Sequence, residues 1–187
     1  MILGTTHNEN VRFQSAVKKV LKIEGGFSDR AADAGGKTNW GITWLTARLN
    51  GYFGLMKNMP LETALKIYKK AYWDKLNCVL FTNQAVSERL FDIGVNTGVR
   101  NAAKWIQRTL NALNRYQKSW NDIKVDGKIG RVTAGVCNQA CLNTMTLQNV
   151  LKALNCLLGY HYIKLAEDPK RRDELNLNGW LNQRIMI

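Results

Sequence analysis

The sequence predicts a mainly α-helical protein with one short β-hairpin, and two features of its 187 residues lead to this fold class. Most of the chain carries apolar residues three and four positions apart, which is the period of an amphipathic helix. Residues 25–43 break this pattern with two glycine pairs and short polar stretches. A hairpin with Gly35-Gly36 at its turn fits this segment. The expected architecture is α+β, with the hairpin directly after the first helix.

The length and composition predict one domain over residues 1–187. Apolar residues make up 45% of the chain, there are only two prolines, and no linker-like stretch divides the sequence. A chain of this length can bury one sizeable core. We expect a lobe at residues 1–120 that carries the hairpin, and a helical part at residues 121–187.

The helices are expected where apolar periodicity follows a capping residue. The C-terminal GWLNQRI is expected to pack Trp180 and Ile185 back onto the body. The expected helices, with their starting or capping residues where the sequence suggests one, are 8–23 (Asn8 or Asn10), 44–50 (Thr43), 60–73 (Pro60), 87–95, 99–113 and 146–165 (Thr146).

Glu24 is a candidate for acid–base chemistry because it continues the apolar stripe of the first helix. Val20 and Leu21 precede it by four and three residues, so its carboxyl group is expected at the core or at the margin of a cleft. Gly25-Gly26 then ends the helix and places Glu24 at the negative end of the helix dipole. Burial and this dipole raise the pKa of the carboxyl group. A protonated carboxyl group suits a general acid for a glycosidic oxygen, and a solvated glutamate is the alternative.

Asp33 and Thr38 supply the second polar group that such a reaction needs. Eight residues separate Glu24 from Asp33, and four separate Asp33 from Thr38. In an inverting glycosidase, a second group positions water on the opposite face of the sugar, with the carboxyl groups about 6.5–9.5 Å apart. A tight hairpin after Glu24 would fold Asp33 and Thr38 back to face it at such a distance.

Four further residues are candidates for substrate binding, and each has a structural alternative. Trp40 either packs the hairpin on the core or stacks on a sugar ring. Tyr72 ends a helix, where it is a core aromatic unless a cleft passes nearby. Asn96 either binds N-acetyl and hydroxyl groups of a sugar or caps its own helix. Asp92 shares a helix face with Asn96 and is expected to be a structural acid or a hydrogen-bonding partner rather than the second catalytic carboxylate.

The formal net charge of +13 favours a polyanionic partner. Nucleic acid and an anionic cell envelope both meet this description. The basic residues are dispersed and no nucleic-acid motif is present, so nucleic acid is not the expected partner.

The four cysteines and two histidines do not form a zinc pattern, and we expect neither a metal nor an organic cofactor. Buried thiols are the expected state of Cys78, Cys137, Cys141 and Cys156. The N-terminus lacks an apolar segment of signal-peptide length, and no stretch is long enough to span a membrane. The expected site of synthesis is therefore the cytoplasm.

Several motifs appear in order along the chain: EGGF (24–27), DAGGKTNWGIT (33–43), YKKAYWD (68–74), FDIGVNTG (91–98), AAKWIQRTLN (102–111), VDGKIGRVT (125–133) and GWLNQRI (179–185). Together they resemble glycoside hydrolase family 108, the N-acetylmuramidases of phage, prophage and bacterial genomes. The resemblance extends from about Val17 to Ile185, and Phe27 stands where the family usually has tyrosine.

The resemblance implies a lysozyme-like fold and hydrolysis of the β-1,4 bond between N-acetylmuramic acid and N-acetylglucosamine. Glu24 would be the acid, and Asp33 with Thr38 would stabilise the oxocarbenium-like state or place the water. Tyr72 and Asn96 would then lie near the cleft, with Gln107 as a further candidate there. The implied partners are peptidoglycan strands, and a holin that would let an endolysin reach them. Residues 121–187 resemble a peptidoglycan-binding part.

Three other functions stay open at this point. A lytic transglycosylase also uses one glutamate but leaves an anhydro-sugar end. A wall-binding or secretion-associated protein would keep the fold without turnover. A basic nucleic-acid binder is supported by the charge alone, and its binding would weaken strongly with salt.

Overall fold

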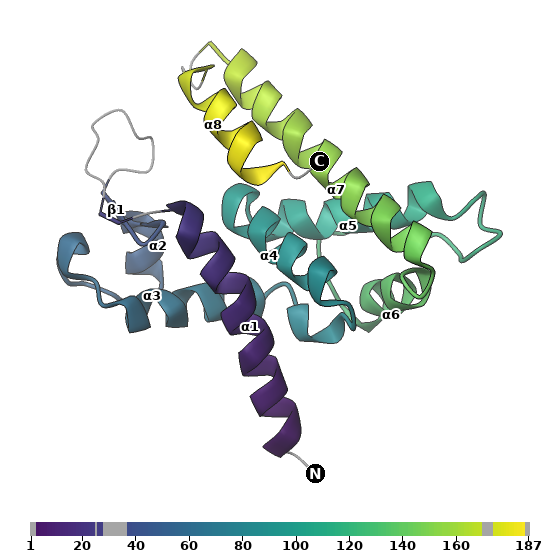
Figure 1. The fold of residues 1–187 in the computed structure, drawn as a ribbon, viewed down its shortest axis with the longest axis horizontal. Coiled ribbons are helices and arrows are strands. Elements are labelled where there is room, and N and C mark those ends of the chain that lie inside the picture. The colour runs from purple at the N-terminus through teal and green to yellow at the C-terminus, as the bar shows by residue number, and fades with distance from the viewer. Residues whose placement is uncertain (1–2, 25, 28–36, 170–173, 186–187) are drawn as a thin grey trace. The chain divides into compact units, whose positions relative to one another are not determined.

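The computed structural model describes residues 3–24, 26–27, 37–169 and 174–185. The chain forms two compact units, Met1–Val79 and Leu80–Ile187. The expected mainly helical fold is confirmed, because helices make up most of both units and the one two-stranded sheet in the described residues follows α1 (Figure 1). The expected division of roles between residues 1–120 and 121–187 stays a prediction, since compactness alone does not assign a role.

Helix α1 (Leu3–Glu24) begins the first unit and buries one apolar face. It starts earlier than predicted, because Asn8 and Asn10 lie inside the helix rather than at its cap. An asparagine inside a helix costs only about 0.5 kcal/mol relative to alanine, which is too little to end a helix whose next turns are buried. The buried face consists of four residues that are at most 3% exposed: Phe13, Ala16, Val17 and Val20.

The hairpin pairs β1 (Thr38–Asn39) with β2 (Ile42–Thr43) in antiparallel register, with Thr38 opposite Thr43. Its two-residue turn is Trp40-Gly41, so the prediction of Gly35-Gly36 as the turn was wrong. Gly35-Gly36 lies outside the described residues. The error arises because the turn places Trp40 at φ 52°, in a left-handed conformation that sequence rules assign to glycine or asparagine.

Five short helical elements follow the hairpin in the described residues before α4. Thr43 caps α2 (Trp44–Leu49) as predicted, since its side chain accepts a hydrogen bond from the Thr46 N–H. A 3-10 turn, η1 (Met56–Asn58), leads to α3 (Leu61–Tyr68), which begins one residue after the predicted Pro60. The chain then continues as a π-helical segment, η2 (Lys69–Trp73), and a 3-10 turn, η3 (Cys78–Leu80), crosses into the second unit.

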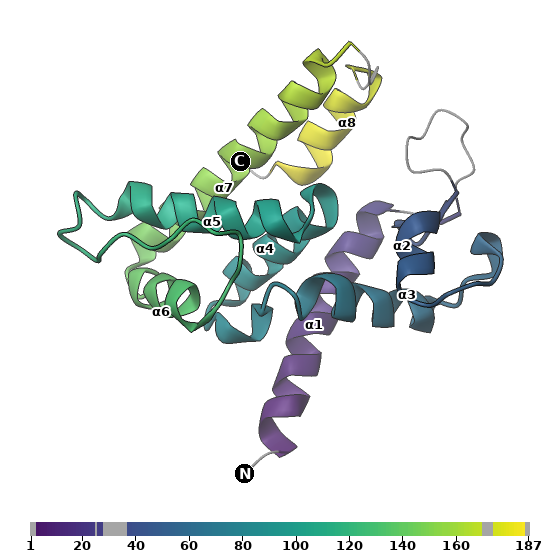
Figure 2. The same ribbon diagram turned by 180° about the vertical axis from the view of Figure 1, so that it is seen from behind.

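Five helices form the described part of the second unit, and α7 and α8 lie side by side in both views (Figures 1 and 2). Asn83 caps the first of them, which therefore starts before the predicted Ser87. Asn143, not the predicted Thr146, caps α7, and its side chain accepts from the Thr146 N–H. The helices are α4 (Gln84–Thr97), α5 (Val99–Leu113), α6 (Arg131–Ala140), α7 (Thr144–Glu167) and α8 (Glu174–Arg184).

Aromatic contacts join the C-terminal helices to the body of the second unit. Trp180 stacks on Tyr162 with ring centroids 5.1 Å apart, which confirms the predicted packing of this segment. His161 meets the Trp105 ring edge-on at 5.7 Å, as expected of a packed histidine. None of the helices that the structure describes is long and apolar enough to cross a membrane.

The four cysteines are thiols rather than disulfides, and three of them are at least partly buried as predicted. Cys78 and Cys137 are buried, and Cys141 is half-buried with its sulfur 3.8 Å from that of Cys137. Cys156 is exposed, so the prediction was wrong at this position. It lies on α7 midway between the buried Leu154 and Leu158, and two residues along a helix turn a side chain to the opposite face.

Candidate functional site

The hairpin that carries Thr38 is held by hydrogen bonds to the segment that follows α2. The Asn39 side-chain amide donates to the Met56 carbonyl at 2.8 Å, and this contact is buried. The Trp40 indole N–H donates to the Met59 carbonyl at 2.9 Å. A two-stranded hairpin of this length is not stable alone, so these side chains fix it in place.

The Trp40 turn is also held from the helix behind it. The hydroxyl of Tyr68, a fully buried residue of α3, donates to the Trp40 carbonyl at 2.8 Å. A non-glycine residue in the left-handed region costs about 1–2 kcal/mol. The hydrogen bonds of the Trp40 carbonyl and indole N–H offset this cost. Of its half-buried indole, only the ring is then left for other contacts.

The three predicted catalytic residues differ in how far the structure describes them. Glu24 is the last residue of α1, as the glycine stop predicted, but its side chain is outside the described part of the molecule. Asp33 lies outside the described residues altogether. Thr38 is half-buried on β1, at the position opposite Thr43. The distances that would join the three into one catalytic group therefore stay a prediction.

Tyr72 lies in the π-helical segment that extends α3. The Asp74 N–H donates to the Lys69 carbonyl, five residues back, at 2.9 Å. Such π-bulges are frequent at functional sites because they turn side chains away from the regular helical register. The half-buried Tyr72 ring lies 5.9 Å from the ring of Tyr68. Tyr72 thus neighbours the residue that holds the Trp40 turn.

Asp92 and Asn96 belong to the second unit, on one face of α4. Asp92 forms ion pairs with Arg89 at 2.8 Å and with Arg184 at 2.5 Å, and both arginine side chains are only 6% exposed. The Asn96 amide donates to the Asp92 carbonyl at 2.7 Å and to its carboxylate at 3.3 Å. This arrangement gives Asp92 a structural role between α4 and α8, and it leaves the Asn96 side-chain oxygen for another donor.

Comparison with protein families finds two matches, one after the other along the chain. Residues 17–98 match the family described as "Glycosyl hydrolase 108", and residues 101–185 match one described as "Predicted Peptidoglycan domain". Residues 17–98 are thus similar to glycosyl hydrolase family 108, which supports a glycoside hydrolase. The second match supports peptidoglycan as the substrate.

One solved structure that resembles this chain is titled "Structure of Brucella abortus SagA". The two share 23% sequence identity with a TM-score of 0.62, over 92% of this chain and 95% of that one. At this identity the likeness shows the fold, and it agrees with the predicted lysozyme-like architecture. No curated protein sequence matches the chain.

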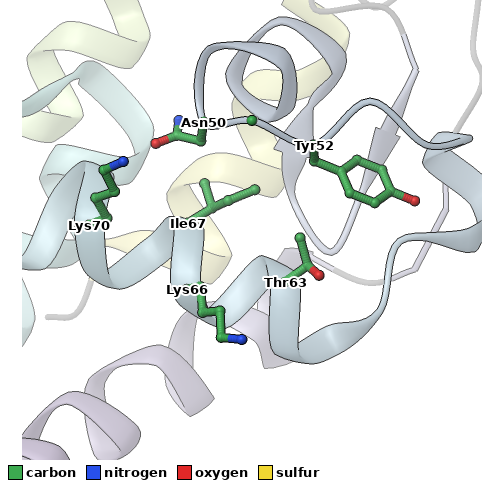
Figure 3. A pocket seen from close by; sticks show the side chains of 7 residues that line it. Asn50, Tyr52, Thr63, Lys66, Ile67 and Lys70 are labelled. Carbon is green, nitrogen blue, oxygen red and sulfur yellow. The ribbon is translucent and has the colours of Figure 1, made fainter.

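The first unit has a groove of about 270 Å³, and none of the candidate residues lines it (Figure 3). Ile67 is its buried apolar component, and Lys66 and Lys70 are the basic residues of its lining. No helical period or motif distinguishes these residues, so sequence reasoning missed them. The lining residues are Asn50, Gly51, Tyr52, Thr63, Lys66, Ile67 and Lys70.

Gln107 is not a cleft residue, contrary to our prediction. It is 1% exposed, and its amide donates to the Asp126 carboxylate and to the Lys128 carbonyl, each at 2.9 Å. Its side-chain oxygen accepts from the Gly127 N–H at 2.9 Å. The prediction failed because the partner loop lies some twenty residues further on, which a helix pattern cannot reveal.

No group of three potential metal ligands occurs among the residues that the structure describes.

Proposed function

We propose that the chain is a lysozyme-type N-acetylmuramidase, which hydrolyses the β-1,4 bond between N-acetylmuramic acid and N-acetylglucosamine in peptidoglycan. The observation that carries this proposal is the match of residues 17–98 to glycosyl hydrolase family 108, because it spans Glu24, Asp33 and Thr38. The match of residues 101–185 supports a polymer of the cell wall as the substrate.

In the proposed reaction, Glu24 protonates the departing glycosidic oxygen. Asp33, together with the Thr38 hydroxyl, stabilises the oxocarbenium-like state or positions the attacking water. One C–O bond breaks, one water adds to the sugar, and a proton from that water replaces the proton that Glu24 donated. The anchored hairpin supports a role for Thr38, because catalytic groups need a fixed position relative to the substrate.

The remaining candidates are proposed to contact the sugar chain. Trp40 would do so through its ring, since Met59 engages its indole N–H. Tyr72 and Asn96 would bind hydroxyl or N-acetyl groups. Asp92 is proposed to act indirectly, because its carbonyl and carboxylate orient the Asn96 amide.

The test compares wild type with Glu24→Gln on purified peptidoglycan, with the soluble fragments identified by mass spectrometry. Glu62→Gln is a matched control, since Glu62 is a surface glutamate of the same unit that pairs with Lys66. We expect reducing muramic acid ends from wild type and from the control, and a loss of at least about a hundredfold in Glu24→Gln. Equal release by all three proteins would remove Glu24 from the mechanism.

The same experiment separates the alternatives. Anhydro-muramic acid ends would identify a lytic transglycosylase. Wall binding without fragments from any variant would identify a non-catalytic wall-binding or secretion-associated protein.

An endolysin role is also proposed, with catalysis in residues 1–120 and wall contact in residues 121–187. The enzyme would be held in the cytoplasm and reach the wall after a holin opens the membrane. Expression in a bacterial host with and without a holin tests this role, because lysis is expected only with both proteins. Lysis by the enzyme alone would show another route of release.

A further inference from the structure

A cluster of large apolar side chains lies exposed on α2 and the loop that follows it. We call these five residues the α2 surface. A folded protein usually exposes such side chains singly, and a cluster marks a surface that binds something. The five side chains and their exposed fractions are Trp44 (47%), Leu45 (58%), Leu49 (77%), Phe53 (75%) and Leu55 (64%).

Arg48 holds this surface in a defined shape. Its guanidinium group lies over the Trp44 ring at 5.2 Å and over the Phe53 ring at 5.6 Å. The same group donates hydrogen bonds to the carbonyls of Tyr52 and Gly54. The two aromatic rings are therefore tied to one cation and to the loop backbone, and the apolar side chains project without collapsing on the core.

The segment that carries the α2 surface has only basic charged residues. Residues 34–61 contain no aspartate or glutamate, and they contain Lys37, Arg48 and Lys57. The whole chain carries a formal net charge of +13. A negatively charged partner would meet no acidic side chain from this segment.

We propose that the α2 surface binds an anionic lipid bilayer. Tryptophan, phenylalanine and leucine beside arginine and lysine are the side chains that insert at the boundary between headgroups and acyl chains. A glycan site needs hydrogen-bonding groups between its aromatic rings, whereas three of these five side chains are leucines. The groove on this unit is lined by other residues. This binding is separate from the proposed hydrolysis and would keep the catalytic unit at the membrane.

Vesicle sedimentation tests the proposal with the full chain. The probes are vesicles of phosphatidylcholine alone and vesicles with about one third phosphatidylglycerol. The test variant is Leu49→Ser with Phe53→Ser, and the control is Leu142→Ser with Leu175→Ser, which removes equally exposed side chains elsewhere (84% and 94%). Because all four side chains are exposed, folding should persist, and circular dichroism checks it.

We expect wild type and control to bind the anionic vesicles, and the test variant to bind about tenfold more weakly. Raising the salt concentration should weaken wild-type binding. Equal binding by wild type and test variant would overturn the proposal, as would no binding by wild type. If the test variant instead lost sedimentation with insoluble peptidoglycan, the α2 surface would be a glycan site. Peptidoglycan hydrolysis measured on the same proteins reports the proposed function separately.

Discussion

The Tyr68 hydroxyl and the Trp40 carbonyl, 28 residues apart in the sequence, are joined by a 2.8 Å hydrogen bond. This bond connects the buried face of α3 to a left-handed residue at the tip of the hairpin. The hairpin that carries Thr38 is therefore held by Tyr68, the first residue of the YKKAYWD motif, in which the sequence suggested only Tyr72 as a functional residue.

Tyr68→Phe removes this hydrogen bond and keeps the ring. We expect the free energy of unfolding to fall by about 1–2 kcal/mol, because the Trp40 carbonyl loses its donor in a partly buried place. Hydrolysis should fall more than stability alone explains, since Thr38 shifts with the turn. Urea denaturation and fragment release measure the two effects. Tyr52→Phe is the control, because its hydroxyl bond to the Leu55 carbonyl is exposed, and it should change little. Unaltered stability in Tyr68→Phe would show that the turn is held by packing.

Gly41→Ala tests the conformation of the turn. Gly41 has φ 73°, where an alanine costs about 1–2 kcal/mol. Gly135→Ala is the matched substitution, because Gly135 lies in α6 and an added Cβ meets nothing within 4 Å. We expect Gly41→Ala to lower the thermal midpoint. Gly135→Ala should raise it, with a gain of about 0.5–1 kcal/mol in the free energy of unfolding. If both variants behaved alike, the turn would tolerate an ordinary side chain.

Asp92→Asn tests whether Asp92 is structural. It leaves Arg89 and Arg184 without their carboxylate, and both guanidinium groups are buried. Removing one partner of a buried ion pair costs about 3–5 kcal/mol. Glu62→Gln, which breaks an exposed pair, should cost less than about 1 kcal/mol. Urea denaturation compares the two, and we expect the folded Asp92→Asn protein to keep most of its turnover. Normal stability with lost turnover would instead make Asp92 a catalytic group.

Thiol labelling tests the burial of the four cysteines. Burial raises the pKa of Cys78, and at Cys137 the hydrogen bond with Cys141 and burial raise the pKa of the thiol. The thiolate is the reactive form, so these two residues should stay unlabelled in the native protein at neutral and mildly alkaline pH. Cys156 is exposed and should react at once, with Cys141 slower. Mass spectrometry of labelled peptides identifies each site. Rapid labelling of Cys78 without denaturant would contradict the structure.

The sequence predicted much of the secondary structure. Within the candidate site, it predicted that α1 ends at Glu24. The α1 stripe and the Thr43 cap both depend on residues within a few positions of one another. Caps were misplaced at Asn8 and Thr146, because a capping side chain marks a possible start and burial of the following turns decides between candidates.

By itself, the sequence determined the helical periodicity, the order of the family motifs and the glycine break after Glu24, since local spacing carries each of them. Only the tertiary structure decided that Trp40 forms the hairpin turn, that Gln107 holds a loop and that Asp92 pairs with Arg184. The physical reason is distance along the chain. Asp92 and Arg184 are 92 residues apart, and Tyr68 meets Trp40 only after α3 packs behind the hairpin. Such contacts arise when separate elements bury their apolar faces together, and no local pattern records which polar groups then become neighbours.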